Sequence, residues 1–233
     1  MTRPTTPNES DGKVTVEGAP DEAIDQKVAV LRLRAKLHFP NVLLTLTSII
    51  QALALETLWS RVEAEIETKG LAGIPLDSWL QVSALLIAIM VLWIYYVQLV
   101  MRLVWVPSLT DSLIPFALGI AQFTEAYLLG KSNVAVWLLP FPMIFLLGLA
   151  AWHLTLARAR RESENTAVIA GFMPESRIAR FGPMLGSALL LALLTLAVWI
   201  RPATSTLALA ILNLLMLGHL GLQGVYWRSS VEG

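Results

Sequence analysis

Carboxyl and amide side chains occur inside long apolar stretches of this sequence, where such groups are costly and usually serve a purpose. In the segment 106–129, Asp111, Gln122 and Glu125 fall on one side of a helix, because each residue advances by about 100°. The two carboxyls are fourteen residues apart, which is roughly 21 Å along a helix axis. Acidic groups at both ends with an amide between them are what a path for protons or cations needs. We therefore take these three residues as candidates for permeation or proton relay.

A simpler explanation competes with this one, because charges near the ends of a span are cheap at the membrane interface. In that case Asp111 caps its helix or pairs with Arg102, and Glu125 meets the outer interface near Lys131. The residues alone leave both explanations open.

A second polar stripe follows the segment 40–60. Asn41, Thr45, Ser48 and Glu56 also share one side of a helix. We expect Glu56 and Glu125 near the outer face, where they can share a vestibule and hold a proton between them. Alternatively, these groups bond neighbouring helices, at about 0.6 kcal/mol each.

Two histidines within the apolar segments are weaker candidates. His153 and His219 lie in different segments, so their imidazoles can in principle ligate a haem or relay protons. They carry no motif spacing, and a structural hydrogen bond is the alternative. We predict no resident cofactor and no metal site, since cysteine is absent as well.

The composition excludes several functional classes. Of 233 residues, 56% are hydrophobic and only 15% are charged, whereas soluble domains carry about 25% charged residues. The net charge is zero, which argues against a nucleic-acid partner. Phosphate-binding loops, nucleophile elbows and metalloprotease motifs do not occur in the sequence, so we do not expect an enzyme.

Apolar segments of about 20 residues predict an all-α integral membrane protein, a bundle of six transmembrane helices. We place the membrane domain at 40–228, preceded by a disordered tail at 1–27 and a basic amphipathic segment at 28–39. The basic segment either binds anionic lipids at the cytoplasmic face or extends the first helix. The predicted spans are 40–60, 79–101, 106–129, 134–157, 182–200 and 205–227.

The distribution of Lys and Arg beside the spans predicts that both termini are cytoplasmic. One side collects ten such residues and the other side four, and the larger number marks the cytoplasm. The ten are Arg32, Arg34, Lys36, Arg102, Arg158, Arg160, Arg161, Arg177, Arg180 and Arg228; the four are Arg61, Lys69, Lys131 and Arg201.

We therefore expect a multi-pass protein of the cell membrane, inner or plasma, that passes an ion or small solute. The path would be lined by the first and third spans, with the bilayer and a second copy or a membrane complex as partners. The alternative function is a non-catalytic assembly factor or accessory subunit of a larger membrane complex.

Overall fold

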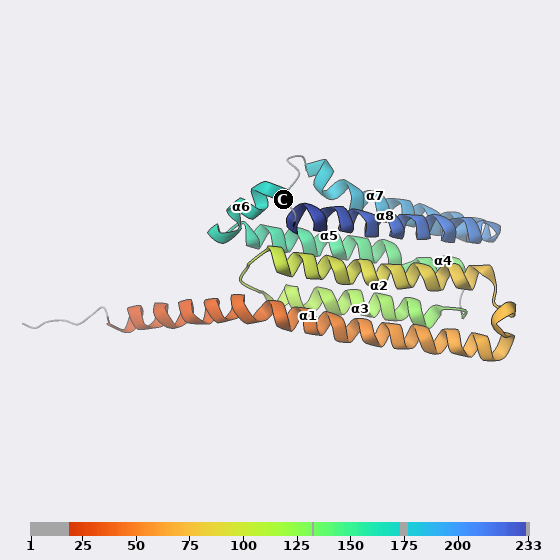
Figure 1. Cartoon of the computed structure of the whole chain (residues 1–233), viewed down its shortest axis with the longest axis horizontal. Helices are drawn as coiled ribbons and strands as arrows, with labels where there is room; N and C mark the ends of the chain where they lie inside the picture. Colours follow the sequence, from red (N-terminus) through yellow and green to blue (C-terminus); the bar gives the residue numbers. More distant parts are fainter. Residues whose placement is uncertain (1–18, 132, 173–176, 232–233) are drawn as a thin grey trace, which may run out of the picture.

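The computed structural model describes residues 19–131, 133–172 and 177–231, and within these residues every regular element is a helix. The helices run lengthwise beside one another (Figure 1). The α-helices are α1 (Ala19–Lys69), α2 (Leu76–Arg102), α3 (Leu109–Leu128), α4 (Val134–Leu138), α5 (Pro140–Ala159), α6 (Thr166–Phe172), α7 (Arg177–Ile200) and α8 (Ser205–Val231). Short 3-10 turns occupy Leu71–Gly73, Ser163–Asn165 and Pro202–Thr204.

Five stretches of the described chain are long and apolar enough to cross a membrane, which makes this a polytopic membrane protein. The helix α3 coincides with the predicted third span but is not among the five, because Asp111, Gln122 and Glu125 lower its hydropathy. The number of six spans therefore stays a prediction. The five stretches are Ile24–Lys69, Leu76–Arg102, Val134–Ala159, Phe181–Ile200 and Pro202–Arg228.

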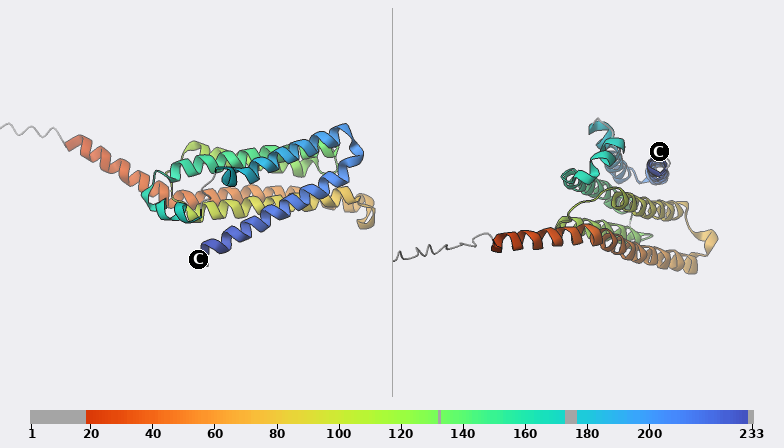
Figure 2. Two further views of the ribbon diagram at one scale, coloured as in Figure 1. Left: turned by 90° about the horizontal axis from the view of Figure 1, so that it is seen from above. Right: turned by 60° about the vertical axis from the view of Figure 1, so that its left-hand side comes forward.

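The first helix is much longer than the sequence predicts. It has 51 residues and continues through Pro40, which gives a length of about 76 Å. Its N-terminal part extends beyond the bundle, as both views in Figure 2 show. Segment 28–39 thus belongs to the same helix as the predicted first span, and its contact with anionic lipids stays a prediction.

The predicted disordered tail extends too far, because residues 19–27 are helical. The reason is a local start signal: Pro20 in the first turn is followed by Asp21 and Glu22, and both features favour a helix N-terminus. Residues 1–18 of that prediction lie outside the described part of the chain.

The helix of the fourth apolar segment is interrupted near its N-terminal end. Helix α4 ends at Leu138 and α5 begins at Pro140, with Leu139 as a turn between them. Pro140 and Pro142 lack the amide hydrogens that would continue the hydrogen-bond ladder of α4. Trp137 and Phe141 on either side of this break are fully buried in the core, with ring centroids 5.0 Å apart.

Polar contacts along their whole length join α2 to α8. They combine side-chain pairs with side chains that donate to carbonyl oxygens, which is how helices associate in lipid. The contacts are Ser205 and Thr206 to Asp77 (2.8 and 2.6 Å), Ser83 to Asn213 (2.8 Å), Asn213 to the Leu80 carbonyl (2.9 Å), Gln98 to the Gln223 carbonyl (2.9 Å) and Arg102 to the Tyr226 carbonyl.

The two described ends of the chain lie toward the same end of the bundle (Figure 1). This arrangement fits an even number of crossings. The cytoplasmic placement of the termini stays a prediction, as does the identity of the membrane.

Candidate functional site

The buried side of α3 carries the polar residues that the sequence singles out. Gln122 and Glu125 are both 0% exposed, and Asp111 is 7% exposed. For the side-chain oxygens of Glu125, and for both polar atoms of Gln122, the described residues provide no hydrogen-bond partner. Two unsatisfied polar side chains one helical turn apart are unusual in a protein interior and call for an explanation.

Two contacts hold this side of α3 in the bundle. Gly119 faces α1, where a Cβ at its position would collide with the side chain of Ile50, so only glycine permits this approach. At the level of Glu125, the indole nitrogen of Trp137 donates to the Glu125 carbonyl oxygen at 2.9 Å. The backbone of Glu125 is thereby fixed, while its carboxyl group has no hydrogen-bond partner in the described part of the chain.

At the other end of the stripe, Asp111 has a complete set of partners. Its carboxylate forms a salt bridge with Arg158 of α5 and accepts a hydrogen bond from the Ser108 amide at 2.7 Å. The second guanidinium nitrogen of Arg158 donates to Thr110 at 2.9 Å. Asp111 therefore caps α3 and ties it to α5.

The alternative in which Asp111 pairs with Arg102 is wrong. Arg102 precedes Asp111 by nine residues in the chain, but its guanidinium donates to the Tyr226 carbonyl of α8. Arg102 is the last residue of α2, and α2 packs along α8. The Arg102 side chain therefore lies beside α8. Arg158 takes its place beside Asp111.

Further polar contacts gather at the same end of the bundle. Asn165, which is buried, donates to the carbonyls of Val104 (2.5 Å) and Ala159 (2.7 Å) and accepts from the Val104 amide (2.9 Å). Lys36 of α1 lies 2.5 Å from Glu162. The Asn165 hydrogen bonds join the connections that follow α2 and α5, and the Lys36–Glu162 pair ties α1 to the second of them. No local sequence pattern predicts these contacts.

Between the two ends, Tyr96 of α2 is a further residue that the sequence analysis missed. Its hydroxyl is buried, and no hydrogen-bond partner for it occurs in the described ranges. The side chain belongs to the buried cluster that also contains Leu99 of α2 and Leu118 of α3. Unpartnered polar atoms among the described residues therefore occur on both α2 and α3.

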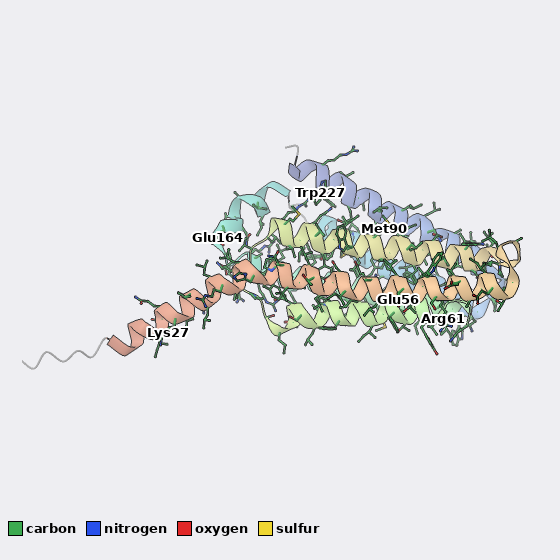
Figure 3. All side chains as sticks on the ribbon, turned by 60° about the horizontal axis from the view of Figure 1, so that its bottom comes forward. Lys27, Glu56, Arg61, Met90, Glu164 and Trp227 are labelled. Atoms are coloured by element: carbon green, nitrogen blue, oxygen red, sulfur yellow. The ribbon has the colours of Figure 1, made fainter. Side chains whose placement is uncertain are left out.

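The polar stripe of α1 points in the opposite direction. Asn41, Thr45, Ser48 and Glu56 are all exposed, and Glu56 is labelled on α1 in Figure 3. The buried residues of α1 are Leu43, Thr47, Gln51, Ala54 and Leu58. Thr45 is satisfied by the Asn41 carbonyl of its own helix at 2.8 Å.

The prediction that Glu56 and Glu125 share a vestibule is therefore wrong, since one carboxyl lies outside the bundle and the other inside it. Both inner and outer sides of α1 carry polar residues, so the sequence pattern could not decide which side is buried. Lys131 does not approach the Glu125 carboxyl either; its ammonium lies 4.3 Å from the ring centre of Tyr127.

The two histidines do not face each other. His219 is buried; its Nε2 is 2.8 Å from the Ser187 hydroxyl and its ring is 4.9 Å from Phe145. His153 is exposed and packs against Phe181. Eight residues of α5 separate Phe145 from His153, or about 12 Å. This arrangement does not provide the paired axial ligands that a haem between the helices needs.

Clusters of three or more His, Cys, Asp or Glu residues that could hold a metal ion do not occur in the part of the chain that the structure describes. A comparison with profiles of known protein families, with curated proteins and with solved structures found no match to this chain.

Proposed function

We propose that this polytopic membrane protein transports protons or small monovalent cations, and that Glu125 and Gln122 form its internal binding site. One observation carries the proposal: both side chains are fully buried without a hydrogen-bond partner among the described residues. An ionised carboxylate in such a place is strongly destabilising unless a proton or a cation accompanies it. Carboxylate and amide oxygens are suitable ligands for either.

The route is gated rather than open. At the end of the bundle near Asp111, the Arg158 salt bridge and the Asn165 hydrogen bonds hold the connections together. Transport therefore requires these contacts to open and close as the buried site changes its exposure, as in carriers that alternate between two accessible states. In this proposal Asp111 is part of the gate, and Tyr96 lies beside the route.

A second candidate function is supported by a different observation. The exposed polar stripe of α1, with Glu56 on it, is what a contact with another membrane-embedded protein would need. An accessory subunit or assembly factor would use this surface and would have no transport activity of its own.

Flux measurements distinguish these candidates. The purified full-length chain is reconstituted in liposomes of one lipid composition, loaded either with a pH-sensitive dye or with a dye for Na⁺ or K⁺. We expect dissipation of an imposed proton or cation gradient at least several-fold faster than in protein-free liposomes. Rates equal to protein-free liposomes for H⁺, Na⁺ and K⁺ would overturn the transport proposal and leave the accessory role.

A further inference from the structure

The surroundings of the Glu125 carboxyl are apolar and tightly packed. Trp137 of α4, whose indole donates to the Glu125 carbonyl, belongs to the same buried core as Ala126 of α3 and Leu58 of α1. Neighbouring atoms leave almost no surface of either carboxyl oxygen of Glu125 open to a water molecule. A negative charge in such a place loses its hydration and gains little in return. The protonation state of this carboxyl therefore depends on which charged groups face it.

Helix α1, which packs along α3, brings no counter-ion to this carboxyl. Glu56 is exposed. The next charged residue along α1 is Arg61, whose guanidinium carbon lies 4.9 Å from the ring centre of Tyr127. Tyr127 is 50% exposed, so this contact draws Arg61 toward the surface of the bundle. The positive charge nearest along α1 thus serves a different side of α3.

The other helices that pack against α3 bring no charge either. They are α2, α4 and α5, and the segments 79–101 and 134–157 within them contain no Asp, Glu, Lys or Arg. Their titratable groups are two tyrosines, which are neutral at physiological pH, and His153, which is exposed. Among the described residues, nothing on these helices can balance an ionised Glu125.

A metal cation fits this site poorly. Sodium and potassium give up their water only where several protein oxygens replace the hydration shell. Glu125 offers two oxygens and Gln122 one, and the two side chains are not hydrogen-bonded to each other. A cation would also have to displace the packed side chains around the carboxyl. A proton needs one oxygen atom and no additional volume.

We propose that the ion bound at Glu125 is a proton, and that Glu125 is a neutral carboxylic acid at physiological pH while the bundle is closed. The inference rests on the transport proposal and names its substrate: H⁺, to the exclusion of Na⁺ and K⁺. Uptake of one proton converts the carboxylate to the neutral acid, and its release restores the carboxylate. Gln122, one helical turn away, can accept a hydrogen bond from the acid after a change of rotamer.

Infrared spectroscopy reads the protonation of Glu125 without any measurement of flux. The C=O stretch of a neutral carboxylic acid is well separated from the bands of a carboxylate. The full-length parent protein and the Glu125→Gln variant are compared in liposomes at neutral pH, with Glu56→Gln as the matched control. We expect the parent-minus-Glu125→Gln difference to contain the neutral-acid band, and the Glu56→Gln protein to keep that band.

A titration of the parent protein needs no variant and tests the exclusion of metal cations. We expect NaCl or KCl, added in the infrared cell to protein equilibrated on both sides of the membrane, to leave the neutral-acid band unchanged. Loss of the band on addition of either salt would show that the cation displaces the proton. Carboxylate bands in place of the neutral-acid band in the Glu125→Gln difference would overturn the proposal directly.

Flux in liposomes separates the identity of the ion from transport itself. A pH gradient is imposed in sodium, potassium or N-methylglucamine medium, each with a membrane-permeant anion to balance charge. We expect proton flux several-fold above protein-free liposomes and within twofold in the three media, with Na⁺ and K⁺ fluxes at the protein-free rate. Sodium or potassium flux that Glu125→Gln abolishes would overturn this inference and keep the transport proposal. Absence of all three fluxes would overturn the transport proposal, and the neutral-acid band would then still support proton binding at Glu125.

Discussion

Glu56 and Glu125 lie at the same level of two parallel helices and point in opposite directions. α1 and α3 run the same way because the chain returns through α2 and then reverses again (Figure 1). Ile50 of α1 meets α3 at Gly119, and each acid follows that contact by six residues. Glu125 is completely buried, whereas Glu56 is exposed. The pair therefore offers a matched comparison: the same chemistry at the same depth, inside and outside the bundle.

The Asp111–Arg158 salt bridge should be energetically coupled, because the Asp111 side chain is only 4% exposed and shares its charge with one guanidinium. We expect Asp111→Ala and Arg158→Ala each to lower stability, and the double variant to lose less than the sum. A coupling free energy of about 1–3 kcal/mol is expected. Denaturant titration of the four proteins in detergent checks it, and strictly additive losses would contradict the pairing.

The close approach of α1 and α3 should depend on Gly119. Gly119→Ala places a methyl group against the side chain of Ile50, and such overpacking costs about 1–3 kcal/mol. A second substitution, Ile50→Ala, should restore part of the loss. The control is Gly148→Ala, because a Cβ at Gly148 meets no atom within 4 Å. Thermal unfolding in detergent measures all four proteins; equal effects of the two glycine substitutions would disprove the contact.

In the connection that follows α5, substitution of Asn165 should lower the stability of the protein most. Asn165→Ala removes three hydrogen bonds and leaves polar backbone atoms of Val104 and Ala159 without their partner. A loss of at least about 2 kcal/mol is expected. Asn165→Asp keeps the acceptor for the Val104 amide but not the two donated bonds, so it should also destabilise. An equal melting temperature for Asn165→Asp and the parent protein would show that the two donated hydrogen bonds do not contribute to stability.

We expect the Gln122 side chain to lower the stability of the fold and to be required for flux. Its amide is buried without a partner among the residues described, so Gln122→Leu removes an unsatisfied group and keeps a similar volume. We expect the melting temperature to rise by about 2–4 °C, the value for roughly 1 kcal/mol in a chain of this size. The same variant should lose most of its flux, because the site loses one of its two ligands. A destabilised variant with full flux would assign Gln122 a purely structural role.

The sequence predicts the buried side of α3 well because that helix has one polar side, and Asp111, Gln122 and Glu125 all lie on it. It also places the ends of α2 within a few residues, since Arg102 and the charged loop before Leu76 bound an uninterrupted apolar run. Periodicity suffices where only one side of a helix differs from the rest.

Other features could not be predicted from the chain alone. α1 has polar residues on both sides, Gln51 inside and Glu56 outside, so the direction of its stripe depends on tertiary packing. Asp111 and Arg158 are 47 residues apart, and Asn165 and Val104 are 61 apart. No local pattern relates such pairs, and only the arrangement of the helices brings them together.

The central claim is tested most directly by proton and cation flux in liposomes that contain either the Glu125→Gln or the Glu56→Gln variant. Both substitutions remove one carboxyl at the same depth and keep its shape, and quantitative recovery of folded protein confirms equal reconstitution. We expect Glu125→Gln to reduce flux at least tenfold and Glu56→Gln to leave it within twofold of the parent protein. Full flux through Glu125→Gln would contradict the assignment of the internal site.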